Sequence, residues 1–501
     1  MDYTDHIKQY HKPFLNIYGT LVDSAVRYPD KIAIADDERS VTYAQLLNEA
    51  DNYASKIAGL KLNTGDQVGF VMVNNIRMVS CFYGAVKLGC IVVMINTKFK
   101  AEEIAKLLSE MDVKAVFCDE RWKDKVTGTA EKLGICHVIT ENYDWGEIEE
   151  KKTSYVQNPD YPAVIMHTSG TSGPPKGVMI THRNILETAY GYQEIQGLDS
   201  SAVTVLSVSL FHILGLSCVT TYFIYLGGTI VMSAFYDVKD VLKNIVKWKA
   251  THFHSVPTVY HQIILAGSGK VSLSSLKVTV CGGAPIKEER VREFVKLAPN
   301  ASFRLAYGMT ETAGSGALSR GHREPLKAVK NVYIEVQGKN GRSLKPYEKG
   351  EIVFYGPVVA KGRWNCESLK EDRMPSGDTG YMDEEGRIFV LDRMKDLINR
   401  GGEKIFPSEI ESTLLEYPGI IAASVVGVRD EEYGELPAAV VVPGRGEKVD
   451  KEALKYWMKE RTATFKMPCM FEIWDSLPVT QNGKVRKTEI RKMLEEMRDK
   501  G

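Results

Sequence analysis

The sequence predicts an α/β protein: a large N-terminal domain with two parallel-sheet subdomains and a small distorted β-barrel, followed by a small α+β domain. Three observations support this prediction. From about residue 20 to 300, short apolar runs alternate with helical patterns. Near residue 331 the pattern changes to short strands and turns. Residues 395–501 then form an α+β pattern long enough to fold separately. We therefore place the domain boundary after residue 394.

The N-terminal domain begins with alternating helices and strands. Apolar residues at helical spacing predict the helices, and short runs rich in Val and Ile predict the strands. The predicted helices are 20–29, 42–60, 78–90 and 101–111, and the predicted strands are 31–37, 67–73, 91–96 and 114–119. The same alternation resumes through 241–250, 252–264, 277–283 and 288–298. Repeated strand–helix–strand units favour parallel pairing of the strands.

A loop rich in glycine and hydroxyl side chains, HTSGTSGPPKGVMITH, occupies residues 167–182. We expect a buried strand before it and a helix from residue 182. A loop between a strand and a helix commonly holds phosphate, because glycine lets backbone N–H groups approach an anion and hydroxyls add donors. The order is not that of a Walker A loop, because Lys176 lies between Pro175 and Gly177. Taken alone, the loop is as compatible with a solvated connection as with a phosphate site.

Residues 200–236 contain no Asp, Glu, Lys or Arg, which raises the question of a membrane span. A spanning helix needs about 20 predominantly apolar residues. Here His212, Gly215, the pair Gly227–Gly228 and many Ser and Thr residues interrupt the run. We therefore predict a strand, a buried helix at 214–226 and a second strand, all inside the core.

Composition narrows the class of protein further. The 501 residues are too many for one core, and the formal net charge of zero gives little support to a nucleic-acid partner. The eight cysteines lie far apart without a CxxC pair, which fits reduced thiols better than disulfides or a zinc site. The amino terminus lacks the apolar core of a signal peptide. We expect a cytoplasmic protein with no transmembrane segment. A homodimer is one possible assembly that the sequence leaves open.

The later part of the chain contains shorter elements. Strands are predicted at 332–337, 350–356 and 386–392. The C-terminal domain is expected to contain helices at 408–417 and 451–463, strands at 421–428 and 436–443, and a charged final helix. Three motifs lie among these elements: AYGMTET at 306–312, SGDTGYMDEEGRIFVLDRMKD at 376–396, and PVTQNGKVRK at 478–487.

Together with the loop at 167–182, these ordered motifs resemble the adenylate-forming superfamily, in particular its AMP-forming acyl- and aryl-CoA synthetases. The resemblance spans about residues 20 to 490. It implies that a carboxylate and ATP form an acyl-adenylate and pyrophosphate, after which a thiol attacks. ATP, Mg²⁺ and CoA are therefore expected, with a small carboxylic acid as substrate. A carrier-protein phosphopantetheine is the alternative acceptor.

The resemblance also assigns roles to residues. It implies β- and γ-phosphate contacts from the loop, namely from Thr168, Ser169, Gly170, Thr171, Ser172, Gly173 and Lys176. It implies an adenine slot formed by Gly283, Ala284, Pro285, Ala306, Tyr307 and Gly308. Thr310 is expected at the α-phosphate, Glu311 on Mg²⁺, and Asp378 with Arg393 at the ribose. Lys484 would be the mobile catalytic lysine, and Lys395 the hinge of a rotating C-terminal domain. Gly401 and Gly402 would border a pantetheine tunnel.

Residue His212 bears on the identity of the acid. It resembles the gating histidine of acyl- and aryl-CoA ligases, and it occupies the place where amino-acid-activating domains typically have Asp. A plain buried histidine is the alternative. Gly308 stands where acetyl-CoA synthetases have Trp, which favours a medium- or long-chain fatty acid or an aryl acid. His252 and His254 are unusual in a mostly apolar lining and could meet a second polar group of the acid.

Two segments depart from the family pattern and leave the local loop geometry open. RMPSGD replaces W-x-x-T-G-D, and GHREPLKAVKNVY replaces G-x-x-G-x-P. A catalytically inactive scaffold is a second class of function, but such a protein would be expected to have lost Lys484, Glu311 or Asp378, and all three are present. A luciferase-like oxygenase is a third, and it would use the same adenylation residues.

Overall fold

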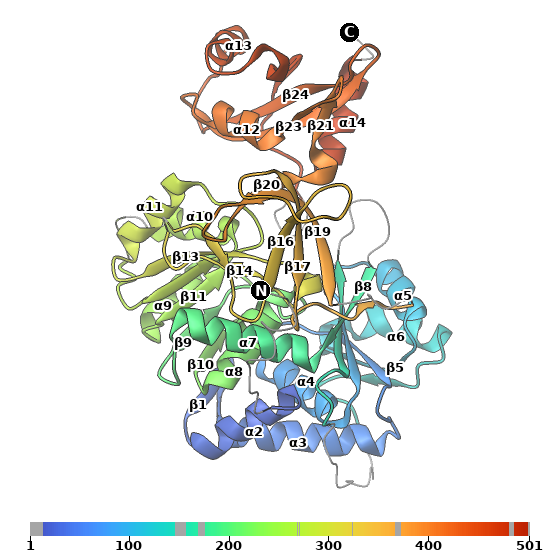
Figure 1. The fold of residues 1–501 in the computed structure, drawn as a ribbon. Helices are drawn as coiled ribbons and strands as arrows, with labels where there is room; N and C mark the ends of the chain where they lie inside the picture. The colour runs from blue at the N-terminus through green and yellow to red at the C-terminus, as the bar shows by residue number, and fades with distance from the viewer. Residues whose placement is uncertain are drawn as a thin grey trace. The chain divides into compact units, whose positions relative to one another are not determined.

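The computed structural model describes residues 14–145, 157–168, 176–267, 269, 271–322, 324–365, 372–479 and 485–498. The chain divides into two compact units (Figure 1). Unit 1 comprises Met1–Ile334 and Phe354–Met374, and unit 2 comprises Glu335–Val353 and Pro375–Gly501. Each unit is described by itself below.

One sheet of unit 1 has seven strands in the order β18-β8-β7-β4-β3-β5-β6. All pairs among β7, β4, β3, β5 and β6 are parallel. The pairs β7–β8 and β8–β18 are antiparallel. The strands are β3 (Gln67–Val71), β4 (Ile91–Met94), β5 (Val113–Cys118), β6 (His137–Ile139), β7 (Pro162–Thr168), β8 (Lys176–Thr181) and β18 (Gly362–Arg363). The accompanying helices are α3 (Tyr43–Gly59), α4 (Ile76–Leu88), α5 (Ala101–Glu110) and α6 (Lys123–Lys132).

The other sheet of unit 1 contains strands in the order β15-β14-β13-β12-β11-β9-β10-β1-β2, and from β13 to β1 all pairs are parallel. Its strands are β1 (Ile32–Ala35), β2 (Ser40–Thr42), β9 (Val203–Leu206), β10 (Thr229–Met232), β11 (His252–Ser255), β12 (Val278–Cys281), β13 (Ser302–Tyr307), β14 (Ala317–Leu318) and β15 (Leu326–Ala328). The predicted α/β class with parallel sheets is thereby confirmed.

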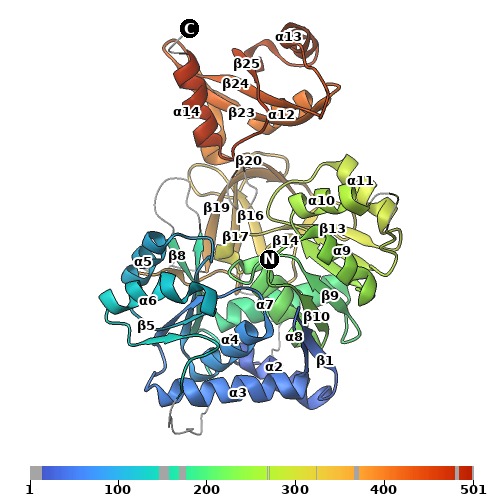
Figure 2. The same ribbon diagram turned by 180° about the vertical axis from the view of Figure 1, so that it is seen from behind.

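The two faces of this second sheet are covered by different helices. Figure 2 shows one group together beside the strands: α9 (Val238–Lys247), α10 (Pro257–Gly267) and α11 (Glu288–Leu297). Phe253 and Phe303 pack against these helices in a common core with Tyr260 and Phe294. The opposite face contacts α7 (His182–Gln196) and α8 (Tyr222–Leu226), since Tyr192 and Phe223 lie against β11 histidines. Helix α2 (Ile17–Arg27) belongs to the same unit.

The prediction for residues 200–236 is confirmed. Strand β9 is followed by a π-helix, η2 (Leu214–Thr221), then by α8 and by strand β10. The residues of η2 from Gly215 onward are buried in the protein core. Among the residues that the structure describes, no helix is long and apolar enough to cross a membrane.

The prediction for residues 167–182 is corrected in one respect. A second strand, β8, lies between the loop and helix α7 and pairs antiparallel with β7 from Thr168–Lys176 to Pro162–Thr181. Val178 and Ile180 are buried, and Met179 packs against the core cluster that contains Ile165, so both faces of this strand are covered. The loop therefore closes a hairpin and does not lead directly into a helix.

Unit 2 contains the predicted short strands and the C-terminal α+β pattern. The first strands, in the order β16-β17-β19-β20, are β16 (Tyr333–Gln337), β17 (Gly350–Tyr355), β19 (Arg373–Met382) and β20 (Arg387–Arg393). The C-terminal sheet consists of β21 (Ile398–Arg400), β22 (Glu403–Ile405), β23 (Ile420–Asp430), β24 (Gly434–Pro443) and β25 (Met470–Ile473). Its helices are α12 (Pro407–Leu415), α13 (Lys451–Lys459) and α14 (Lys487–Arg498).

Candidate active site

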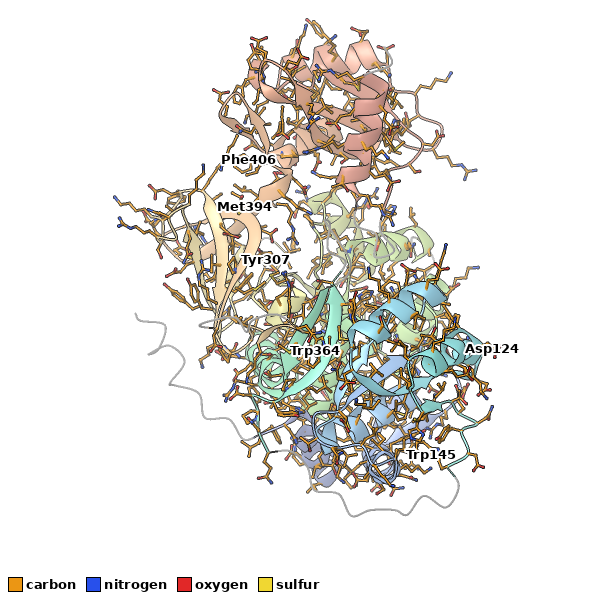
Figure 3. All side chains as sticks on the ribbon, turned by 90° about the vertical axis from the view of Figure 1, so that its right-hand side faces the viewer. Asp124, Trp145, Tyr307, Trp364, Met394 and Phe406 are labelled. Carbon is orange, nitrogen blue, oxygen red and sulfur yellow. The ribbon has the colours of Figure 1, made fainter. Side chains whose placement is uncertain are left out.

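The ends of β12 and β13 bring the predicted adenine-slot residues of unit 1 together. Residues 282–285 follow β12, and Tyr307 is the last residue of β13. A Cβ added to Gly282 would lie 3.2 Å from the Cβ of Ala306, so the two strand ends approach closely. The Tyr307 ring lies against Phe354, with centroids 5.3 Å apart (Figure 3). In parallel sheets such carboxyl ends of neighbouring strands form the usual ligand crevice.

A tight turn follows Tyr307 and holds Thr310 and Glu311. Residues Thr310–Thr312 form a 3₁₀ turn, and the Thr312 hydroxyl donates to the Met309 carbonyl at 3.1 Å. A Cβ on Gly308 would lie 2.8 Å from the Gly314 carbonyl oxygen. Gly308 thus allows the two arms of the turn to pack closely, a structural role in addition to the predicted one.

The side chain of Glu311 is mostly buried and faces a cation. Its residue is 8% exposed, and its carboxylate lies 4.0 Å from the guanidinium of Arg363. The backbone carbonyl of Glu311 accepts a hydrogen bond from Ala360 at 2.8 Å. Among the described residues, no group of three or more His, Cys, Asp or Glu side chains could hold a metal ion by itself.

Arg363 was not predicted from the sequence. It lies on β18, which pairs with β8 through Gly362–Met179 and Arg363–Val178. The next residue, Trp364, donates its backbone N–H to the Gly177 carbonyl at 2.9 Å. The hairpin that carries the predicted phosphate loop is therefore connected through β18 to Glu311. No sequence motif marks Arg363, because its relevance depends on the pairing of distant strands.

Most of the predicted phosphate loop and the predicted catalytic lysine lie outside the described residues. Thr168 ends β7 and pairs with Lys176 at the start of β8. The predicted contacts of Ser169, Gly170, Thr171, Ser172 and Gly173 lie outside the described residues, as does Lys484. Val479 and Val485, which precede and follow the Lys484 segment, form an antiparallel bridge.

Unit 2 brings Asp378 and Arg393 together. They are register partners in β19 and β20, and Arg393 Nε lies 2.8 Å from Asp378 Oδ1. The Asp378 side chain is 11% exposed and that of Arg393 is 46% exposed. Lys395 follows in the 3₁₀ turn Met394–Asp396, where burial lowers the pKa of its ammonium against the opposing effect of the Asp396 carboxylate. These three predicted residues thus lie within one local structure.

Gly401 and Gly402 form the turn between β21 and β22. Their φ angles are +57° and +96°, in the left-handed region that glycine adopts without strain. The backbone of this hairpin therefore favours glycine here, whether or not a pantetheine chain lies beside it. The predicted role of these residues at a pantetheine tunnel stays a prediction.

His212 lies just before the π-helix η2. Its backbone N–H donates to the Ser209 carbonyl at 3.0 Å, and its carbonyl accepts from Leu216. Its ring is partly exposed and lies 4.5 Å from the Phe211 ring centroid. A π-helix is rare and is often found at functional sites. The gating role predicted for His212 stays a prediction.

Known proteins resemble this chain along nearly its whole length. Residues 21–364 match the family model described as AMP-binding enzyme, and residues 409–484 match the AMP-binding enzyme C-terminal domain. A feruloyl-CoA synthase from Amycolatopsis sp. is 31% identical, over 93% of this chain and 96% of the relative. A 2-succinylbenzoate–CoA ligase from Geobacillus sp. (strain WCH70) is 30% identical, over 96% of this chain and 98% of the relative.

A solved structure agrees with these sequence relatives. It is the O-succinylbenzoate coenzyme A synthetase from Bacillus subtilis in complex with ATP and magnesium ion. The TM-score is 0.82 at 29% identity, and the match covers 94% of this chain and 98% of the other.

Proposed function

Because the chain belongs to the AMP-binding enzyme family and is an AMP-forming acid–thiol ligase, we propose that its acid is a medium- or long-chain fatty acid or an aryl acid. CoA is the proposed acyl acceptor, as the names of the relatives suggest. The position of His212 supports the choice of acid, because a neutral imidazole cannot neutralise an ammonium group as the carboxylate of an amino-acid-activating domain does. We also propose that the boundary between the N-terminal and C-terminal domains lies after residue 394.

The observation that carries the ATP-dependent part of the proposal is the buried carboxylate of Glu311, in the turn that follows parallel strand β13. Mg²⁺ favours one or two carboxylates together with substrate phosphates, so a single glutamate fits MgATP and does not fit a metal held by protein alone. When bound, Mg²⁺ neutralises phosphate charge. Arg363, 4.0 Å from Glu311, would pair with this carboxylate until MgATP binds.

In the first step an oxygen of the acid attacks the α-phosphorus, the bond to the bridging oxygen breaks, and pyrophosphate leaves. Thr310 would donate a hydrogen bond to the α-phosphate, and Lys484 would screen the repulsion between the two anions. Asp378 would accept hydrogen bonds from the ribose hydroxyls while Arg393 holds its carboxylate. In the second step the sulfur of CoA attacks the carbonyl carbon of the acyl-adenylate, the bond from that carbon to the phosphate oxygen breaks, AMP leaves, and the thiol proton is released to solvent.

The test is pyrophosphate release from MgATP with a panel of carboxylic acids, with and without CoA. The proposal predicts acid-dependent release that CoA converts to multiple turnover and that Lys484→Ala abolishes. Lys492→Ala is the matched control, because this lysine lies on α14 with its side chain 79% exposed. A single turnover regardless of CoA would instead indicate a carrier protein as acceptor. Activity on amino acids and on no fatty or aryl acid would refute the proposed substrate class.

A further inference from the structure

Two buried histidines on β11 have polar atoms without partners. His252 and His254 are 0% and 1% exposed. His252 Nδ1 lies 2.9 Å from the Thr204 hydroxyl, but its Nε2 has no hydrogen-bond partner. Neither ring nitrogen of His254 has one. A buried polar group without a hydrogen bond is unfavourable and rare in native proteins. The absence of a partner for His254 therefore calls for an explanation.

His254 lies beside the strand ends that lead into the candidate site. It pairs with Val280 on β12, and a Cβ on Gly282 would lie 3.6 Å from His254 Nε2 and 3.2 Å from Ala306 Cβ. Ala306 directly precedes Tyr307. The imidazole is thus next to the ends of β12 and β13 and not in a remote part of the core.

Helix α7, which packs on the same face of the sheet as His254, connects this histidine to the turn that holds Glu311. The Tyr192 ring lies 6.0 Å from the His254 ring, and its hydroxyl donates to the Gly314 carbonyl at 3.3 Å. Tyr222 lies 5.9 Å from Tyr192, and its buried hydroxyl also has no partner. The space between β11 and these helices therefore contains more than one polar atom without a partner.

The protonation state of His254 restricts what it could bind. Burial lowers the pKa of its imidazole to about 3, so the ring is neutral at physiological pH. A neutral imidazole has one N–H donor and one nitrogen acceptor. A hydroxyl can pair with either one of these groups, and a carbonyl can accept from the donor. An alkyl chain would leave both unpaired, and a second carboxylate would be best held by a charged histidine.

We propose that His254 determines acid specificity by hydrogen bonding to a hydroxyl or carbonyl oxygen at the end of the acid remote from its carboxylate. The inference rests on the proposed function and narrows it, because an unsubstituted fatty or aryl acid would satisfy neither ring nitrogen. His254 contacts no reacting atom in this proposal and affects only the choice of acid.

The test compares aryl acids that differ only in a para substituent: hydroxyl, acetyl, methyl or carboxylate. For the wild-type protein, kcat/KM of pyrophosphate release should be at least about tenfold higher with hydroxyl or acetyl than with methyl. His254→Leu should bring this ratio close to one, and His254→Gln should restore part of it. Thr279→Val is the control, because Thr279 pairs with Phe253 on the opposite face of the sheet.

Two results would overturn the inference: a ratio that His254→Leu leaves unchanged, or a wild-type preference for the methyl or carboxylate acid. Calorimetric binding of the same acids to the full chain separates this inference from the proposed function, because it needs no turnover. Binding of the hydroxyl or acetyl acid that depends on His254, without pyrophosphate release, would support the inference and refute the proposed function. Equal binding of all four acids, or none, would overturn the inference.

Discussion

Replacing Asp378 by Asn should weaken ATP binding about tenfold while leaving the fold intact. The Asp378 carboxylate is held by Arg393 at 2.8 Å and is mostly buried, so it is oriented and charged before nucleotide binds. A hydrogen bond to a charged acceptor stabilises by about 1.5–3 kcal/mol, against about 0.5–1.5 kcal/mol for a neutral one. The difference of about 1–1.5 kcal/mol corresponds to roughly five- to fifteenfold in affinity. The lost ion pair involves a half-exposed arginine and should cost the fold no more than about 1 kcal/mol.

The assay is calorimetric titration of ATP into each variant, with thermal unfolding measured in parallel. Asp383→Asn is the matched control in the same hairpin. Asp383 is buried, pairs with Arg387, and accepts backbone hydrogen bonds from Glu385 and Arg387 at 3.0 and 2.9 Å. It should lower stability and leave ATP affinity unchanged. The reasoning is refuted if Asp378→Asn binds ATP like the wild type, or if Asp383→Asn weakens binding equally.

Three further predictions concern unit 1. Arg363→Gln should lower the Mg²⁺ concentration that gives half-maximal pyrophosphate release about two- to fivefold. The reason is that the half-exposed Arg363–Glu311 ion pair, of about 0.5–1 kcal/mol, no longer competes with Mg²⁺ for the Glu311 carboxylate. An unchanged or higher Mg²⁺ requirement would contradict this prediction. Gly314→Ala should lower the free energy of unfolding by about 1–3 kcal/mol in denaturant titration, because φ of Gly314 is +84° and the added Cβ would lie 2.5 Å from Cys218 Sγ. The control is Gly128→Ala in α6, which has open space around it and should be neutral or stabilising. Acid should reduce stability through three buried histidines whose pKa burial lowers, to about 3 in two cases: His182, His252 and His254. Their contribution is complete above the unfolded-state pKa of about 6.5 and is lost as pH falls towards 3, at up to about 1.4 kcal/mol per pH unit for each residue. Thermal unfolding between pH 7 and 4 should show this loss, and His254→Leu should have a shallower slope than the wild type; equal slopes would argue against it.

The local pattern of apolar and polar residues was sufficient to predict most of the helices and strands. It was insufficient at one short strand that borders a loop. The uncharged segment 200–236 was correctly assigned to the core, because its glycines and hydroxyl side chains are incompatible with a span and compatible with two short strands around a helix. Strand β8 was missed because residues 176–181, KGVMIT, show no polar–apolar alternation and directly follow residues that are typical of a loop. Its existence depends on pairing with β7, which is a tertiary property.

The candidate site shows the same division between residues with a motif and residues without one. Asp378 and Arg393 were singled out by motifs, yet their ion pair arises from the register of β19 and β20, which no spacing rule specifies. Arg363 has no motif and reaches Glu311 only because β18 joins the edge of β8. The residues recognised by type and order are those that the family resemblance assigns to ATP, the part of the substrate pair that does not vary with the acid. Arg363 and His254 have no motif, and the roles proposed for them follow only from neighbours that the fold brings close, so the substitutions above are needed to establish them.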